Sequence, residues 1–560
     1  MTTEQTTSPP RTGVGIVASG LSRTIHNGRR ILDDISLTIR PGEVVAIIGA
    51  SGAGKTTLLE TLAGVRRPAT GTVAYDGTAE VGVIGLVPQD DIIHRELPLE
   101  RTLRYAAQLR LPPGTGPADV TRRVAEVLAE LRLTERAAVP VGRLSGGERK
   151  RASIAVELLT RPGVFFLDEP TSGLDPAIAV DLLRVLRTLA EAGTTVVLTT
   201  HQITDVDRCD RVVVLTREGR LAFAGTPTDA REFFGLRSLA EVHLRLDEET
   251  DQAVWPDRFA AYRDVEPPPR AGAPDAPTPE HRPVGRLRQW TVLTARNAEI
   301  VARNRLTLAI LLGSPLMVLG MFALLFRPGA FDPTRPSPNV TVMILFWIAF
   351  GGFFFGLTYG LLQICTELPI LHRERLAGVR LVPYLLAKVA VLLPLLALVD
   401  LALLGVLRGI DRLPAVGGDD FAALYATLLL SSAAALALGL LCSAAVSDAA
   451  QATLMLPMLC FPQVLFVGAI LPVPAMAVGG QWLSYAMSNR WAFEGLGHTA
   501  GVERLWRDGG SPLGPPLLAT YGDSFSRPVW VNWLVLGGFV LLFLGATWAV
   551  LVRRESRRAA

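Results

Sequence analysis

The chain has 560 residues, with 55 Lys and Arg against 52 Asp and Glu, a formal net charge of +3, and 49% hydrophobic residues. This length allows two to four domains at about 150 residues each. The near balance of charge excludes a polybasic nucleic-acid binder and a disordered acidic chain. The mean hydropathy of +0.34 is high for a soluble protein, and after residue 305 charged residues disappear from long stretches. We therefore expect a soluble first half and a membrane-embedded second half.

The first twelve residues, MTTEQTTSPPRT, are polar and lack an apolar core, which predicts a disordered start (1–12) and neither a signal peptide nor an anchor. Between residues 13 and 245, β-branched runs alternate with helical patterns. Strands are expected at 44–48, 163–167, 194–199 and 211–215. Alternation of this kind predicts an α/β domain with a largely parallel sheet.

The segment 246–285 is rich in Pro, Ala and acidic residues and includes EPPPRAGAPDAPTPEHRP. That composition predicts a linker that cannot bury a core. Residues 286–305 then combine apolar residues with five arginines. This pattern predicts an amphipathic connecting helix at the membrane surface, although a soluble surface helix would show it too.

Six apolar stretches in the second half are long enough to cross a bilayer, which takes about 20 apolar residues per helix. They lie at 306–326, 340–364, 384–407, 422–446, 453–472 and 530–552. An even number puts both ends on one side, and the connections on that side carry more Lys and Arg, which indicates the cytosol. The sequence thus predicts an all-α six-helix transmembrane domain over 306–560 in the cytoplasmic membrane, with a long outer loop at 473–529.

A glycine-rich segment, GASGAGKT, directly follows the strand VVAII and opens the helical run TTLLETLAG. Phosphate oxygens need backbone N–H donors at close range, and glycines let the loop curl without side chains in the way. The following helix adds its positive N-terminal end. We expect Lys55 to neutralise the β and γ phosphates and the Thr56 hydroxyl to coordinate Mg²⁺. The candidate nucleotide-binding residues here are Gly49, Ser51, Gly52, Gly54, Lys55, Thr56 and Thr57.

Two carboxylates, Asp168 and Glu169, directly follow the apolar strand VFFL. They are expected at the carboxyl edge of the sheet, where α/β proteins bind ligands. Asp168 would hold Mg²⁺ directly or through water, and Glu169 could polarise an attacking water. Acidic residues after a strand also cap helices, so a purely structural role is the alternative.

The segment LSGGE, Leu144 to Glu148, opens a further helical run. A Ser-Gly-Gly helix start has an ordinary capping role. The same hydroxyl and free backbone donors at a helix N-terminus can also form a second phosphate-binding surface. A single domain does not need two such surfaces for one ATP.

Together these motifs resemble the ATP-binding-cassette (ABC) family. The resemblance rests on the phosphate loop, Gln89 in VPQDD, LSGGE, the strand end LDEP, SGLD at Ser172 to Asp175, and His201 in TTHQ. It implies an α/β P-loop NTPase domain with a helical subdomain over 13–245, and ATP and Mg²⁺ as cofactors. It also implies a head-to-tail pair of such domains, in which each ATP lies between the phosphate loop of one copy and Ser145 and Gly147 of the other.

The resemblance assigns roles residue by residue. Gln89 would sense Mg²⁺ and the lytic water, Glu169 would act as the base, and His201 would contact the γ-phosphate. Asp175 would lie at the dimer interface. The candidate Mg²⁺ ligands are Thr56, Gln89 and Asp168. The adenine-stacking position, normally aromatic, falls at His26, which offers a weaker stacking surface.

Finer matches resemble the G subfamily of this family. They are the segments VPQDDIIHRELPLERTLRYAAQLRLP and LSGGERKRASIAVELLTRPGVFFLDEPTSGLD, together with the order of soluble domain first and six helices after. In the second half, HRERLAG at 372–378 and NRWAFEGL at 489–496 are similar to that group's cytosolic and outer loops. The likeness is strong over 15–235 and moderate thereafter. The outer loop lacks the cysteines of animal relatives, which suggests a bacterial relative.

The resemblance implies an ATP-hydrolysing half-transporter that dimerises in the lipid bilayer, binds no nucleic acid, and exports an amphipathic or lipid-like substrate. Its partner would be a second copy of itself, with a related chain as the alternative. The competing function is a membrane mechanotransducer that moves an outer-facing partner without passing a substrate.

Several features of the second half can each be interpreted in two ways. Asp400 interrupts the third predicted span, where it either lines a pathway or serves a structural role. The charged loop 367–375 either passes movement to the helices or is simply solvated. The aromatic residues Trp482, Tyr485 and Trp491 favour an interfacial belt or outer lid over a binding site.

Overall fold

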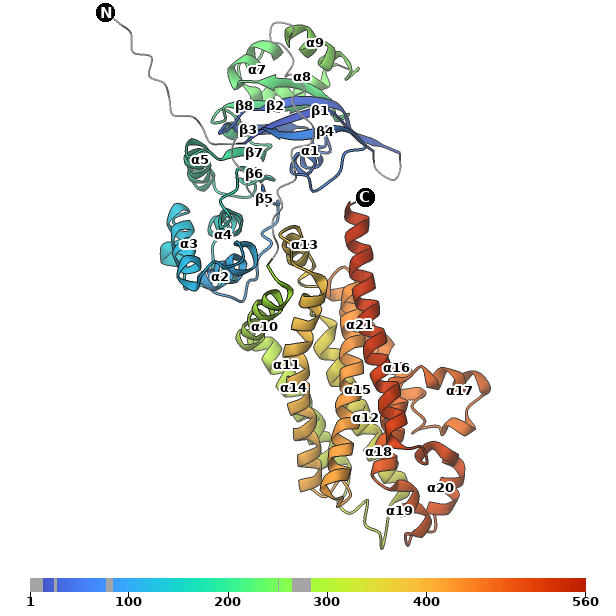
Figure 1. Ribbon diagram of the computed structural model, residues 1–560. Helices are drawn as coiled ribbons and strands as arrows, with labels where there is room; N and C mark the ends of the chain where they lie inside the picture. Colours follow the sequence, from blue (N-terminus) through green and yellow to red (C-terminus); the bar gives the residue numbers. More distant parts are fainter. Residues whose placement is uncertain (1–13, 25–27, 77–83, 250, 264–283, 560) are drawn as a thin grey trace, which may run out of the picture. The chain divides into compact units, whose positions relative to one another are not determined.

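The computed structural model describes residues 14–24, 28–76, 84–249, 251–263 and 284–559 (Figure 1). The chain divides into two compact units. The first comprises Met1–Gly285, Arg373–Val379 and Arg558–Ala560, and the second Arg286–His372 and Arg380–Arg557. The disordered start expected at 1–12 and the adenine-stacking candidate His26 lie outside the described residues.

The centre of the first unit is a six-stranded sheet with strand order β5-β6-β7-β3-β8-β9. In that order the strands are Ile84–Val87, Val164–Leu167, Thr195–Thr199, Val44–Gly49, Arg211–Leu215 and Leu221–Gly225. All neighbours pair in parallel except β8 and β9, which are antiparallel. Every residue of β3, β6 and β7 is buried, as expected of parallel strands covered on both faces. The predicted α/β fold is confirmed.

A second, antiparallel sheet has the order β2-β1-β4. Its strands are Arg30–Ile39, Gly15–Thr24 and Thr70–Asp76. The Thr195 hydroxyl connects the two sheets, because it accepts from the Gly42 N–H at 3.0 Å and donates to the Val14 carbonyl at 2.7 Å. Both sheets therefore belong to one core.

Nine α-helices are described in the first unit's continuous part. They are α1 Lys55–Leu62, α2 Leu99–Arg110, α3 Pro117–Glu130, α4 Gly146–Leu158, α5 Pro176–Glu191, α6 Ile203–Val206, α7 Pro227–Phe234, α8 Val242–Asp247 and α9 Val254–Arg263. Helices α1 and α5 contact β3 and β7, whereas α2, α3 and α4 pack on one another. Figure 1 shows α2 and α3 beside α4 and away from the three-stranded sheet.

The prediction of a linker over 246–285 is wrong for the first part of that range. Helix α9 lies inside that range and buries Trp255 and Phe259 in the core of the first unit. Their rings lie 5.2 Å from that of Phe234 and 5.3 Å from that of Phe223, respectively. The prediction rested on the acidic and Pro-rich composition of the segment. It took no account of two aromatic residues spaced four apart, which is the spacing that puts them on one helix face. Residues 264–283 lie outside the described part of the chain.

The second unit is built of helices. They are α10 Arg286–Arg303, α11 Arg305–Leu325, α12 Pro338–Leu361, α13 Leu368–Leu376, α14 Leu381–Gly409, α15 Gly418–Ala445, α16 Ala449–Leu465, α17 Val478–Tyr485, α18 Ser488–Thr499, α19 Val502–Asp508, α20 Gly514–Tyr521 and α21 Val529–Ala559. The last four residues of α13 belong to the first unit.

Five helices of the described residues are long and apolar enough to cross a membrane. The spans are Leu308–Leu325, Pro338–Leu361, Leu381–Gly409, Gly418–Ala445 and Val529–Ser556. The span predicted at 453–472 is instead the 17-residue helix α16, which contains Pro457 and Pro462. At 1.5 Å per residue it is about 25 Å long, shorter than the hydrocarbon core of a bilayer. One of the six predicted spans is thus shorter than expected.

Helices α12 and α15 pack with their backbones close together. A Cβ on Gly356 would lie 2.1 Å from the Ser432 carbonyl oxygen, and one on Gly360 would lie 2.5 Å from the Leu436 carbonyl oxygen. Small residues at such contacts are what allows membrane helices to approach closely. Helix α14 also packs on α12 and α15.

The segment expected as an outer loop, 473–529, contains helices α17 to α20. The Arg490 guanidinium pairs with Glu494 at 2.8 Å, and Arg527 pairs with the same carboxylate at 3.1 Å. Of the three aromatic residues singled out in the sequence, Trp482 is 74% exposed, whereas Trp491 is buried and donates its indole N–H to the Tyr485 carbonyl. The segment is therefore folded, and the three side chains do not form one exposed surface.

Candidate functional site

The glycine-rich loop leads from β3 into α1, as the sequence predicts. Gly54 caps α1 with φ of 87°, a left-handed conformation that favours glycine. A Cβ at this position would also lie 2.8 Å from the Ile31 carbonyl oxygen. Ser51 and Gly52 are exposed, so the outer part of the loop is open to a ligand. Thr57 lies in the first turn of α1 and is buried, whereas the preceding Thr56 is exposed.

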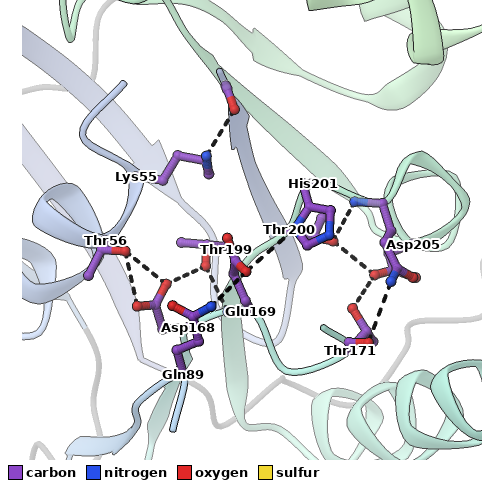
Figure 2. Close-up of polar contacts among 12 residues, drawn as sticks. Lys55, Thr56, Gln89, Asp168, Glu169, Thr171, Thr199, Thr200, His201 and Asp205 are labelled. Atoms are coloured by element: carbon purple, nitrogen blue, oxygen red, sulfur yellow. Dashed lines mark hydrogen bonds and ion pairs between the residues drawn. The ribbon is translucent and has the colours of Figure 1, made fainter. Parts of the chain in front are cut away.

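The ammonium of Lys55 lies within the loop. Its Nζ donates to the carbonyls of Gly49 at 2.9 Å and Ala50 at 3.1 Å. Burial lowers the pKa of Lys55, while the nearby carboxylates of Glu169 and Asp168 act in the opposite direction. A positive charge, as a triphosphate needs, is thus held against the backbone of the glycine-rich loop (Figure 2).

Two of the predicted Mg²⁺ ligands are brought together. The Thr56 hydroxyl donates to Asp168 Oδ2 at 3.0 Å, and the Thr199 hydroxyl donates to Asp168 Oδ1 at 2.6 Å. Asp168 is buried at the end of β6. Mg²⁺ prefers oxygen ligands and is usually bound by one or two carboxylates together with phosphates and water. A hydroxyl and a carboxylate in contact beside the phosphate loop fit that ion.

The three predicted catalytic residues converge from loops that follow three different strands. Gln89 Nε2 donates to Glu169 Oε2 at 3.1 Å, and His201 Nδ1 lies 3.5 Å from the same oxygen. The Glu169 N–H donates to the Thr199 hydroxyl at 2.9 Å. The backbone of Glu169 has φ of 43°, a strained value for a residue with a side chain. Figure 2 shows the carboxylate of Glu169 between Gln89 and His201.

A buried carboxylate that the sequence analysis missed fixes two of these loops. Asp205 Oδ2 accepts from the Thr171 hydroxyl at 2.6 Å and from the Thr200 hydroxyl at 2.9 Å. Thr171 lies two residues beyond Glu169, and Thr200 precedes His201 (Figure 2). Asp205 therefore positions the loops that carry the candidate base and the candidate γ-phosphate contact.

A buried lysine on α4 was also missed. Lys150 Nζ donates to the Pro88 carbonyl at 3.2 Å and to the Gln89 carbonyl at 2.7 Å. Burial lowers the pKa of Lys150, opposed by the charges of Asp91 and other carboxylates. Because Ser145 begins the same helix, Lys150 connects the LSGGE segment to the backbone of Gln89.

Within one chain, the LSGGE segment has the capping role. The Ser145 hydroxyl accepts from the Glu148 N–H at 3.3 Å, and Glu148 Oε2 accepts from the Ser145 N–H at 2.9 Å. Gly147 is buried, and a Cβ there would lie 2.5 Å from Ile178 Cγ2. Asp175 caps α5 through the Ala177 N–H at 2.9 Å. Ser145 itself is exposed, and its binding of a second copy's ATP stays a prediction.

Arg373, from the charged loop of the second half, is buried within the first unit. Its Nε lies 2.7 Å from Glu157 Oε1, and its Nη1 donates to the Ile92 carbonyl at 2.8 Å. Arg110 pairs with Glu157 Oε2 at 2.7 Å. Burial alone would raise the pKa of Glu157, but the charges of Arg110 and Arg373 hold it below its usual range. The solvated interpretation of this loop is wrong for Arg373.

Comparison with known proteins identifies the family to which the chain belongs. A family model described as ABC transporter matches residues 32–172, and one described as ABC-2 type transporter matches residues 288–499. Together the two matches take up more than half of the chain.

Among curated proteins, the ABC transporter ATP-binding/permease protein Rv1747 of Mycobacterium tuberculosis is 34% identical over 512 residues, which cover 88% of this chain and 58% of that protein. ABC transporter G family member 22 of Arabidopsis thaliana is 40% identical over 219 residues, 37% of this chain and 29% of that protein. The chain thus spans less than two thirds of these relatives.

A solved structure of cbiO1 from Clostridium perfringens, described as part of the ABC transporter complex cbiONQ, is 29% identical. The match covers 39% of this chain and 90% of that one, with a TM-score of 0.36. With an ABC transporter domain followed by an ABC-2 type transporter domain and G family members among its relatives, the chain belongs to the ABC transporters and is similar to their G family.

Proposed function

We propose that the chain is an ATP-hydrolysing half-transporter that works as a dimer and exports an amphipathic or lipid-like substrate across the cytoplasmic membrane. The observation that carries the proposal is the convergence of Gln89 and His201 on the Glu169 carboxylate, next to Asp168 and the phosphate loop. Acid, amide and imidazole groups from three loops meet where a terminal phosphate would lie. The apolar helices of the second unit supply the path across the membrane.

In the proposed reaction, Glu169 accepts a proton from the attacking water, and Gln89 holds the carboxylate that receives it. Lys55 neutralises charge on the β and γ phosphates. Mg²⁺, held by Thr56 and Asp168, with Gln89 sensing it, would supply further charge neutralisation when bound. His201 is exposed beside Glu169, where its ring can contact the γ-phosphate.

The exposed position of Ser145 supports the proposed dimer. This residue is exposed at the N-terminus of α4, where backbone N–H groups and the helix dipole favour an anion. One chain carries one phosphate loop and one such helix end. Two copies arranged head to tail would each complete the ATP site of the other, with a related chain as the alternative partner. ATP then favours the closed pair because it contacts both surfaces only there.

Movement would pass to the membrane helices through α13. The last part of this helix, from Arg373, packs in the first unit, and its first part, Leu368–His372, belongs to the second. Arg373 is buried against Glu157 rather than solvated, so a displacement of α4 would displace α13. The N-terminal domain and the C-terminus would both lie in the cytosol.

The assigned base is tested with Glu169→Gln. The purified protein, reconstituted in liposomes, should bind ATP and Mg²⁺ as the wild type does, because the amide keeps the shape of the side chain. Its ATP hydrolysis should fall by about 10²–10⁴-fold, since the proton acceptor is gone. Glu191→Gln, at the exposed end of α5, is the matched control and should hydrolyse normally. Wild-type turnover by Glu169→Gln would refute the assigned base.

A mechanotransducer is the second candidate, and the folded outer segment favours it. This segment has an internal core held by Glu494 and two arginines, and it presents the exposed Trp482 on α17, as a surface for another protein would. Liposomes discriminate between the two functions. ATP-dependent movement of labelled phospholipid or amphipathic dye supports export, whereas ATPase activity without movement of any of these probes favours the mechanotransducer.

A further inference from the structure

The third membrane span contains a fully buried acid. Asp400 lies on α14 and is 0% exposed. Within the described residues, neither of its carboxyl oxygens accepts a hydrogen bond of ordinary geometry. Counting 1.5 Å per residue, Asp400 lies about 13 Å along the axis from the end of α14 at Gly409. The side chain is therefore held inside the helix packing, away from water.

The groups around Asp400 are hydroxyls. Ser432 on α15 is a polar neighbour of the carboxyl group, and the Ser432 hydroxyl is itself buried without a hydrogen-bond partner in the described part of the chain. Gly352 on α12 leaves the space for this hydroxyl, because a Cβ there would lie 2.9 Å from Ser432 Oγ. Tyr359 and Tyr425 are within electrostatic range, but they donate to the carbonyls of Leu311 and Ala397 instead.

No cation faces Asp400 from the described helices that pack on α14. Helix α12 contains no Asp, Glu, Lys, Arg or His, α11 has a charge only at its first residue, and α15 has acids only in its first turn. Lys388, on α14 itself, is paired with Glu367 at 2.7 Å, about 18 Å away along the helix. Helix α10 packs near the other end of α14, where Gln289 accepts from the Arg380 N–H.

An ionised carboxylate in such surroundings has neither water nor a counter-charge. The free-energy cost of burying an unpaired charge exceeds that of burying the neutral acid, which can donate its single O–H to a hydroxyl such as Ser432 and accept in return. The helix packing is therefore compatible with the protonated acid. The unpartnered Ser432 hydroxyl and the Asp400 carboxyl group thus form a small polar site of suitable chemistry for one proton.

We propose that Asp400 is an intramembrane proton-binding site, occupied at neutral pH while α12, α14 and α15 are packed as described. Any rearrangement that lets water reach the side chain releases the proton, because solvation then favours the carboxylate. Proton release and movement of these helices are thus coupled. The inference does not depend on ATP hydrolysis or on the identity of any exported substrate.

The test uses dicyclohexylcarbodiimide, which reacts with protonated carboxylic acids in apolar surroundings. The purified full chain in liposomes should be labelled at Asp400 at neutral pH, as located by mass spectrometry, and labelling should fall as the pH is raised. Asp400→Asn should lose this label. Asp419→Asn, which changes an exposed acid at the start of α15, should keep it. Protection by Na⁺ or K⁺ at constant pH would overturn the proposal in favour of a metal-cation site.

Infrared spectroscopy supplies a second measurement that does not require the reagent to enter. The C=O stretch of a protonated carboxylic acid should be present in the wild type at neutral pH and lost in Asp400→Asn. The asparagine variant should fold, because it resembles the neutral acid, and its melting temperature should fall less than that of the wild type as the pH rises. Equal spectra in this region, or an equal pH dependence of melting, would show that Asp400 is not protonated and overturn the proposal.

Discussion

Glu169 is the residue on which the candidate ATP site is centred, and its position is set by neighbours rather than by its own preference. Its φ of 43° is held by the bond from its N–H to Thr199, and its carboxylate is fixed by Gln89. Local strain of this kind is stable only where surrounding contacts determine the geometry. Asp205 and Lys150 provide such contacts indirectly, because they hold Thr171 and the backbone of Gln89 rather than Glu169 itself.

Lys150 can be tested directly. Lys150→Met keeps the long apolar stem but removes both bonds to the carbonyls of Pro88 and Gln89. We expect the rate of ATP hydrolysis to fall by about 10–100-fold, because Gln89 is no longer held against Glu169, while KM for ATP changes little. Steady-state kinetics separate the two parameters. Arg184→Met, an exposed residue of α5, is the control. A changed KM with an unchanged kcat would argue against a positioning role.

Contacts within contiguous motifs could be predicted from the sequence, whereas contacts between distant segments could not. Gly49 to Thr57 and the pair Asp168 and Glu169 could be predicted because loop chemistry and strand ends specify them locally. The partners of Lys150 lie 61 and 62 residues away, and Arg373 pairs with a residue 216 positions earlier. No spacing rule predicts such pairs, since only the tertiary fold brings them together.

At the scale of elements, three helices differ from what their composition indicated. The exposed Ser145 caps the start of α4, and Glu157, which pairs with two arginines, lies in its last turn. Helix α4 therefore joins a candidate phosphate surface to α13. Helix α16 ends at Leu465 and is therefore shorter than the predicted span. The prediction was too long because a hydropathy pattern does not show where a helix ends. The aromatic pair on α9 likewise contributes to the core despite its acidic surroundings.

The buried ion network predicts a pH-dependent loss of stability. Glu157→Gln leaves Arg110 and Arg373 without a counter-charge and should destabilise the first unit by about 3–5 kcal/mol at neutral pH. Because the pKa of Glu157 is lowered in the folded protein, ionised Glu157 stabilises the fold at pH values above the usual pKa of a glutamate. This stabilisation is lost as the pH falls through the lowered pKa. The difference from the wild type in the thermal or chemical unfolding midpoint should therefore narrow in acid. A difference that is constant with pH, or as small as that of Glu191→Gln, would contradict this assignment.

The close packing of α12 and α15 gives a sharper prediction. Gly356→Ala places a methyl group 2.1 Å from the Ser432 carbonyl oxygen, so the helices must separate. Overpacking of this kind costs about 1–3 kcal/mol or more. We expect a lower melting temperature in detergent for this variant. Gly545→Ala, on α21 with nothing within 4 Å of the added carbon, should melt as the wild type does. Equal melting of both variants would show that the predicted contact is not made.

At the scale of the whole molecule, the sequence contains one copy of each motif of the candidate ATP site. It has one phosphate loop and one LSGGE segment, and the residues that the structure describes include one group of long apolar helices. The proposal of a head-to-tail dimer rests on this single copy, because in that arrangement the ATP bound by one chain would meet Ser145 of a second. The order of the two domains, by contrast, could be read from the distribution of charge along the sequence alone.

Mixing two inactive variants tests this proposal. Lys55→Ala removes the phosphate loop's charge, and Ser145→Arg blocks the helix end. In a dimer that pairs one of each, both defects fall in the same composite site and the other site is intact. With random pairing of copies, half of the dimers are mixed, so the mixture should regain about a quarter of the wild-type ATP sites.

The most direct measurement is the ATPase rate of these two variants in liposomes, reconstituted alone and after mixing before reconstitution. We expect almost no hydrolysis by either variant alone and recovery to about a quarter of the wild-type rate in the mixture. Wild-type hydrolysis by Ser145→Arg alone, or no recovery when the two are mixed, would contradict an ATP site completed by a second copy of the chain.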